Sequence, residues 1–231
     1  MKKKIISLCL VLALAATAIV GASLAYFTDT DTETNTFTTG NVKIDLVENF
    51  PETKLLPGEK NALTKEVTVK NVGTEDAYLW IELWIPTALD AGQTDAANNS
   101  LHFNPFDTYK KPDGTLVAMR GSEAKAAGYE LVAETVEVYL GTKNINGVFY
   151  TGYREYIKND TAKKTNECTY NLLSRVFMDQ RVAQCTEHNN CLILANGTNH
   201  YTGSWEIIVN AFGIQAEGFA NIEEAIAAYN A

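Results

Sequence analysis

A two-residue alternation of apolar and polar side chains recurs along this chain and limits the folds open to it. It begins where Val42, Ile44 and Leu46 alternate with Lys43 and Asp45. Because successive side chains of a β-strand point to opposite faces, such alternation predicts strands with one buried and one solvated face. The same pattern recurs in residues 65–71, 77–86, 129–140 (with one slip in register), 147–157 and 204–214. Gly, Pro and Asn turns separate these segments and no strand–helix rhythm appears, so we predict an antiparallel β-sandwich or barrel.

Two strands carry aromatic stripes. In residues 77–86, Leu79, Ile81, Leu83 and Ile85 share one face, and Tyr78, Trp80, Glu82 and Trp84 share the other. A second group consists of Phe149, Tyr150, Tyr153 and Tyr156. We expect both groups to pack within the sandwich, with a glycan or partner platform as the alternative.

Helix is predicted in two short segments. Residues 122–128 begin at Ser122, a candidate N-cap, and end at Gly128. Residues 221–229 have Asn221 as N-cap and Glu224 as its capping-box partner, with one apolar stripe formed by Ile222, Ala225, Ile226 and Tyr229. Residues 168–185 fit helix and strand equally well. One domain is expected over residues 41–231.

Residues 1–25 have the layout of a secretory signal peptide. Lys2, Lys3 and Lys4 precede an apolar run, and small residues at 23 and 25 predict cleavage between Ala25 and Tyr26. The alternative is an uncleaved N-terminal anchor, which would be the protein's only contact with a membrane. We therefore expect an exported protein, with residues 26–40 as its mature N-terminal segment.

The net charge limits the classes of partner that we expect, and the cysteine count limits the possible disulfides. The leader holds three lysines and no acidic residue, so its removal changes the formal net charge from −9 to −12. Nucleic acid and anionic lipid both require basic patches, so we expect neither as a partner. Cys9 lies in the leader, and Cys168, Cys185 and Cys191 remain, which predicts one disulfide of undetermined pairing.

Threonine occupies every second position of residues 28–38. Thr28, Thr30, Thr32, Thr34, Thr36 and Thr38 alternate with mostly acidic residues, and the apolar side chains lie at the ends, in Tyr26, Phe27 and Phe37. The segment is strand-prone but has little to bury. It can be an edge strand, a disordered tail, or a strand that pairs with an exposed edge of another subunit.

Residues 24–46 resemble the leader and mature start of proteins exported through a SipW-type signal peptidase, the class of TasA and camelysin. The resemblance extends more weakly to residues 67–86 and 205–229. It implies a jelly-roll β-sandwich deposited outside a Gram-positive cell, in the biofilm matrix or at the cell surface. It also implies fibre growth, in which residues 26–38 of one subunit complete the sheet of the next.

Camelysin-like members are classed as metallopeptidases, so the resemblance also calls for a search for zinc ligands. The three histidines, His102, His188 and His200, form no H-E-x-x-H motif. The best candidate set is Cys185, His188, Cys191 and His200, with Glu187 as the nearest base. A Cys185–Cys191 or Cys168–Cys191 disulfide is the favoured interpretation of these cysteines.

Other catalytic or metal-binding motifs are incomplete. Residues 29–33 resemble the start of a calcium loop, but Thr34 and Gly40 stand where glycine and glutamate are required. A weak calcium site on these carboxylates is the alternative to a solvated acidic strand. No G-x-S-x-G motif occurs, and we expect neither catalytic residues nor a resident cofactor.

The leading hypothesis is an exported structural protein, a fibre subunit whose partners are its own copies, other matrix proteins and the SipW-type signal peptidase. A secreted camelysin-like metallopeptidase and a monomeric surface adhesin are the alternatives.

Overall fold

The computed structural model describes residues 41–49, 55–186, 191–202 and 206–231. These residues belong to one compact unit, Gly40–Ala231. The predicted signal peptide and the threonine segment lie outside the described residues. No helix in the described part of the chain has the length and apolar character needed to cross a membrane.

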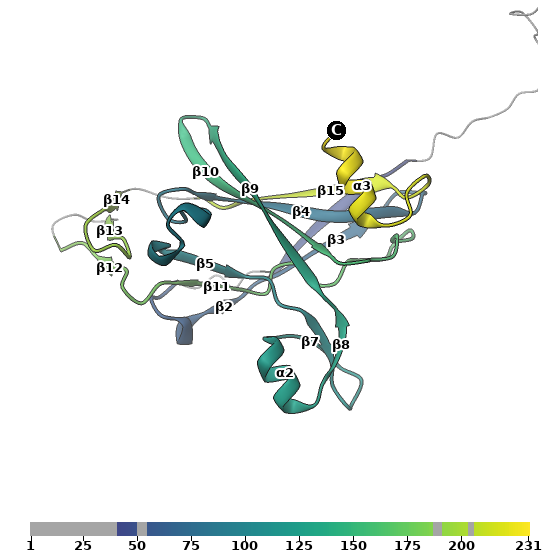
Figure 1. Ribbon diagram of the computed structural model, residues 1–231, viewed down its shortest axis with the longest axis horizontal. Helices are drawn as coiled ribbons and strands as arrows, with labels where there is room; N and C mark the ends of the chain where they lie inside the picture. The colour runs from purple at the N-terminus through teal and green to yellow at the C-terminus, as the bar shows by residue number, and fades with distance from the viewer. Residues whose placement is uncertain (1–40, 50–54, 187–190, 203–205) are drawn as a thin grey trace, which may run out of the picture. The chain divides into compact units, whose positions relative to one another are not determined.

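A four-stranded antiparallel sheet is the larger layer of the fold (Figure 1). Its strands, in spatial order, are β15 (Ile208–Gln215), β4 (Ala77–Pro86), β10 (Val148–Ile157) and β9 (Thr135–Ile145). The register places Ile81 of β4 opposite Glu155 of β10 and Ala211 of β15. A β-bulge interrupts the β9–β10 ladder at Gly152 and Tyr153.

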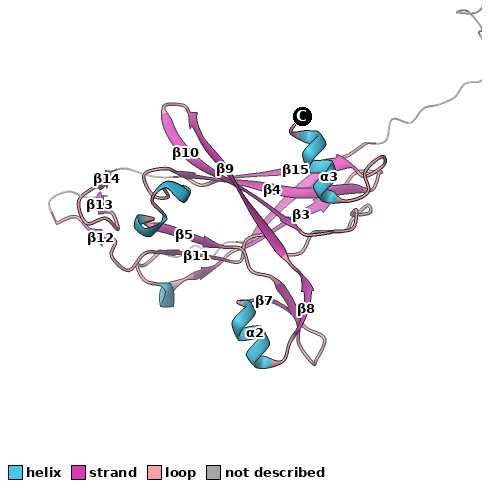
Figure 2. Ribbon diagram, viewed as in Figure 1, coloured by secondary structure: helices cyan, strands magenta, loops and turns pink. Residues whose placement is uncertain are grey.

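The facing layer consists of two smaller sheets. One pairs β1 (Ile44–Asn49) with β3 (Glu66–Asn71), and the other contains β2 (Leu63–Thr64), β11 (Arg175–Met178) and β5 (Leu101–Asn104). Val67 and Val69 of β3 pack with Leu79, Ile81, Leu83 and Ile85 of β4 in the main core, all of them at most 1% exposed. Gly213 of β15 lets the layers approach, because a Cβ there would collide with Ile44 and Leu79. The predicted all-β antiparallel sandwich is confirmed (Figure 2).

Strand β4 departs from the prediction of one solvated face, since all ten of its residues are buried. Helix α3 (Ile222–Tyr229) covers the second face. Trp80 stacks on Phe212 with 5.7 Å between ring centroids and meets Tyr229 edge-on at 5.3 Å. Glu82, on the same face, pairs with Arg154 at 2.7 Å. The aromatic stripe of β4 is therefore packed inside the protein, as expected.

The C-terminal helix begins as predicted. The Oδ1 atom of Asn221 accepts a hydrogen bond from the backbone N–H of Glu224 at 2.8 Å. The carboxylate of Glu224 accepts one from the backbone of Ala220 at 2.7 Å, one residue before the usual capping-box donor. Ile222, Ala225 and Ile226 are buried, and Tyr229 is half exposed.

A fourth sheet contains β7 (Leu116–Ala118), β6 (Thr108–Lys110) and β8 (Glu130–Ala133), in that order, and lies beside helix α2 (Gly121–Ala127). Residues 129–140 thus form parts of two strands in different sheets, β8 and β9, which explains the slip in their alternation. The predicted N-cap at Ser122 is wrong. The chain is already helical at Gly121, so Arg120 is the N-cap and makes no side-chain capping bond. Gly128 ends the helix in the left-handed region, with φ of 71°.

Residues 168–185, for which the sequence left helix and strand open, contain short strands and no helix. Residues 168–174 run along β3, since the backbone N–H of Leu172 donates to Val67 and that of Thr169 donates to Val69. Strand β11 follows, and β12 (Ala183–Gln184) then pairs with β13 (Cys191–Ile193) and β14 (His200–Thr202). Among the described residues, short 3-10 turns lie at Glu59–Asn61, Gly92–Thr94 and Ala96–Asn98.

Candidate functional site

A cavity of about 260 Å³ lies between the two layers, near the open edge of β9. Tyr153 of β10 and Tyr139 of β9 form part of one wall. His102 of β5 lines the opposite side, and Asp90 comes from the loop after β4. The sandwich therefore holds a polar, partly acidic space next to its core.

Asp90 is fixed by three donors. Its Oδ1 atom accepts hydrogen bonds from the backbone N–H of Gly92 at 2.7 Å, from Nδ2 of Asn99 at 2.7 Å and from the hydroxyl of Tyr153 at 3.0 Å. Burial raises the pKa of Asp90, and these hydrogen bonds act in the opposite direction. Burial and then the negative charge of Asp90 raise the pKa of Tyr153, so its hydroxyl is a donor.

Glu155 is a buried carboxyl group of strand β10. It lies on β10 between Tyr153 and Ile157, on the face that packs into the core, and it is 0% exposed. Neither of its carboxylate oxygens has a hydrogen-bond partner. Burial, with the nearby Glu137 as a second cause, raises the pKa of Glu155 well above its usual value. Buried polar groups without a hydrogen-bond partner are rare in folded proteins.

Glu137 stands directly across the β9–β10 pair from Glu155. It has the same orientation as Glu155, but β9 is an edge strand and Glu137 is exposed. Partial burial raises the pKa of Glu137, and the charge of Asp90 adds to the effect. Asp90 and Glu137 line the cavity, whereas Glu155 lies outside its lining and is influenced by Glu137 alone.

His102 is turned toward another carboxylate. Its Nε2 atom lies 3.3 Å from Oδ2 of Asp179, and its ring stacks on Phe177 with 4.9 Å between centroids. Asp179 also accepts hydrogen bonds from the Arg181 side chain, at 2.8 Å to Oδ1 and 3.0 Å to Oδ2. These bonds from Arg181 are the main cause that lowers the pKa of Asp179 to about 2.

The cavity offers proton exchange or cation binding. Carboxylates of this kind hold protons or hard cations through oxygen. No cysteine lines the cavity, and its histidine is already engaged, which leaves oxygen as the main donor atom.

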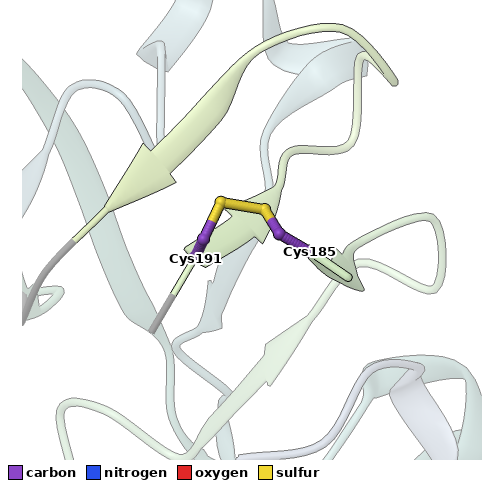
Figure 3. The surroundings of a disulfide bond; sticks show 2 residues. All are labelled: Cys185 and Cys191. Atoms are coloured by element: carbon purple, nitrogen blue, oxygen red, sulfur yellow. A yellow bond between two sulfur atoms is a disulfide. The ribbon is translucent and has the colours of Figure 1, made fainter. Parts of the chain in front are cut away.

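The candidate zinc ligands Cys185 and Cys191 lie away from the acidic cavity in sequence and are shown in Figure 3. Cys185 and Cys191 form a disulfide, one of the two pairings left open by the sequence. The sheet β12–β13–β14 brings His200 close to them, and the three possible ligand atoms lie within 4.8 Å of one another. His188 and Glu187 lie outside the described residues. Cys168 is free and exposed.

Zinc does not fit this arrangement. Zinc takes cysteine as thiolate, and both sulfur atoms are already joined to each other. His200 is then the one nitrogen ligand from the candidate set in the described residues. The residues present at this place form a disulfide-closed loop.

The second aromatic group does not form one surface. Its residues are close in sequence and so point to both faces of β10. Tyr150 is 8% exposed, whereas Phe149 is 61% exposed near the turn of the β9–β10 hairpin. Tyr153 lines the acidic cavity, and Tyr156 lies among the residues packed beneath α3.

Comparison with protein families identifies the first part of the chain. The family described as camelysin metallo-endopeptidase matches residues 1–101. This part of the chain is TasA/camelysin-like. The match runs from the leader through β1, β3 and β4 to the first residue of β5. A search of curated proteins found no match for this camelysin-like protein.

Sequence reasoning missed the acidic cavity. Glu137 and Glu155 were visible only as charged residues within alternating segments, and Asp90 had no motif around it. One signal was present in residues 147–157, because Glu155 has the same period-two phase as Thr151, Tyr153 and Ile157. The buried side of that phase becomes known only from the fold.

Proposed function

We propose that this camelysin-like protein is an exported subunit of an extracellular fibre that grows by addition of an N-terminal strand. The family match supports the general class. The observation that carries the finer proposal is the open edge of the main sheet. Strand β9 is 11 residues long, lies at the end of its sheet, and pairs with β10 alone among the described strands.

An edge of this kind is suited to accept a strand. The backbone N–H and C=O groups on the outer side of an edge strand are free to form a new ladder. Residues 26–38 supply a matching partner, since their alternating threonines favour the extended conformation and leave little to bury within their own domain. One copy then provides the strand and the next provides the edge.

The predicted signal peptide, residues 1–25, supports export. Signal peptidase cleavage after Ala25 would free Tyr26 as the first residue of the added strand. The proposed location is the biofilm matrix or cell surface of a Gram-positive bacterium, with other matrix proteins as further partners.

Electron microscopy of two purified forms tests the proposal. A protein that begins at Tyr26 should form filaments, and one that begins at Asn41 should remain dispersed while keeping the same circular dichroism spectrum. Dispersed protein in both preparations, over a range of concentration and pH, would contradict fibre assembly and favour a monomeric surface adhesin.

A secreted metallopeptidase is the second candidate, and the description of the matching family favours it. The assay is casein cleavage by the purified protein, with and without a chelator. Chelator-sensitive cleavage would support this candidate over the structural one. The disulfide between Cys185 and Cys191 argues against a zinc centre at those residues.

A further inference from the structure

We propose that another cavity, of about 510 Å³, binds a small molecule that combines an apolar body with a carboxylate. Residues of two small sheets, β2–β11–β5 and β7–β6–β8, line this cavity. The inference is independent of the proposed fibre function, because it involves neither the open edge of β9 nor residues 26–38.

One wall of the cavity is a face of the β7–β6–β8 sheet. Thr108 of β6 stands directly opposite Ala118 of β7, and Leu116 lies two residues before Ala118. Cross-strand partners share a face of a sheet, and so do alternate residues of one strand. All three residues line the cavity. The side chain of Thr108 is therefore on the cavity side of this sheet.

The hydroxyl of Thr108 is the first observation that points to a ligand. Thr108 is 4% exposed, and its Oγ1 atom has no hydrogen-bond partner within the protein. Few buried polar side-chain atoms lack a partner in folded proteins, because an unmade hydrogen bond costs free energy. An acceptor atom of a bound molecule would complete the bonding of this hydroxyl.

Arg175 of β11 adds a second unpartnered donor and a positive charge. Its Nε atom is buried without a hydrogen-bond partner, whereas its Nη2 atom donates to Glu59 and, at 3.4 Å, to Asn104. Its Cζ atom lies 5.2 Å from the ring centroid of Phe106, which also lines the cavity. Hydrogen bonds between ionised groups are about twice as strong as neutral ones. A carboxylate is therefore the acceptor that suits both Arg175 and Thr108.

The charge around Arg175 also favours an anion. Glu59 is shared between Arg175 and Arg120, so these three residues carry one net positive charge. Glu66, the one carboxylate among the described residues that line the cavity, is exposed and accepts a hydrogen bond from Asn49 at 3.4 Å. Water and salt screen an exposed charge more than a partly buried one, so the guanidinium of Arg175 dominates.

The rest of the lining selects the apolar body of the ligand. Apolar or aromatic side chains come from Phe106, Leu116, Val117, Ala118 and Tyr170. A volume of about 510 Å³ lies within the roughly 300–1,000 Å³ of small-molecule sites, which combine an apolar lining with a few polar groups that fix orientation. Inorganic phosphate or sulfate would leave the apolar surface uncovered. An aromatic or branched aliphatic acid therefore fits better.

Saturation-transfer NMR of the purified protein that begins at Tyr26 tests the proposal, with 3-phenylpropionate as the probe and 3-phenylpropylamine as its control. The two molecules share an apolar body, but only the acid has acceptor atoms. We expect saturable binding of the acid with a Kd of about 1 mM, and binding of the amine that is weaker by about tenfold or more. Equal binding of the amine, or no binding of the acid up to about 10 mM, would overturn the proposal.

Three variants locate the binding. Thr108→Val removes the unpartnered hydroxyl and keeps the shape, so Tm should not fall while binding of the acid weakens by about three- to tenfold. Leu116→Asn removes apolar contact at a position that is 48% exposed, so it should weaken binding without threatening the fold. Leu131→Asn is the matched control, because Leu131 is 50% exposed and pairs with Tyr109 on the other face of the same sheet. Binding that survives in both cavity variants would overturn the proposal and place the acid elsewhere on the protein.

Discussion

Two glutamates on the central sheet are buried in different ways, one in an ion pair and one without a hydrogen-bond partner. Glu82 lies on the helix-covered face and is paired at 2.7 Å with Arg154, which also donates to Asn230 at 3.0 Å. Glu155 lies on the inner face with no partner. A buried ion pair satisfies its charges locally, whereas an isolated carboxylate must take up a proton or a ligand. The first arrangement ties helix α3 to the sheet, and in the second burial raises the pKa of Glu155 and so favours its protonated form.

Asp179 gives a pH-dependent prediction at the residue scale. Its pKa is lowered to about 2 in the folded protein, from a usual value of 3.8, mainly by Arg181. The ionised form is thus favoured by folding, and this stabilisation is complete above about pH 4 and is lost as pH falls toward 2. We expect Asp179→Asn to reduce the free energy of unfolding by about 1 kcal/mol at pH 7, a value discounted for the exposure of Arg181.

Urea denaturation at several pH values checks this expectation. The difference between the two proteins should shrink steadily between pH 4 and the lowest pH at which both remain folded. Asp45→Asn, at an exposed position of β1, is a suitable comparison. A constant difference across that range would mean that Asp179 acts through packing and not through its charge.

Helix α3 shows which elements are visible in a sequence and which are not. Its cap and its stripe of Ile222, Ala225 and Ile226 are local signals within nine residues, so the prediction matched the structure. The face that the helix covers is set by β4 and β15, far away in sequence, and the burial of Trp80 could not be derived. The division of residues 129–140 between β8 and β9 was hidden for the same reason, because one alternating pattern fits one strand or two.

The N-cap of α3 gives a prediction at the element scale. Asn221→Ala removes the acceptor of the Glu224 backbone N–H and should lower the free energy of unfolding by about 1 kcal/mol. Asn221→Asp retains an acceptor and should cost far less. Chemical denaturation measures both. Equal losses in the two variants would show that Asn221 contributes by something other than its cap.

At the scale of the whole molecule, the sequence defined strands but not the places where distant strands meet. Asp90, Glu137 and Tyr153 line one cavity only because β10 lies between β4 and β9 and the loop after β4 folds back toward them. No spacing rule connects the three positions. The disulfide was easier to predict, since Cys185 and Cys191 are six residues apart and the sequence left two candidate pairings.

The open edge of β9 leads to a prediction about assembly that needs no change in the protein. A synthetic peptide of residues 26–40 carries the proposed added strand but no domain, so it can occupy an acceptor edge without offering one to the next subunit. Growing filaments should therefore become shorter and fewer as the peptide concentration rises, as seen by electron microscopy and light scattering. A peptide of the same composition in scrambled order preserves the charge but not the alternation of threonine and acidic residues, and should have little effect. Equal inhibition by both peptides would attribute the effect to negative charge, and no inhibition by either would remove residues 26–40 from the growing interface.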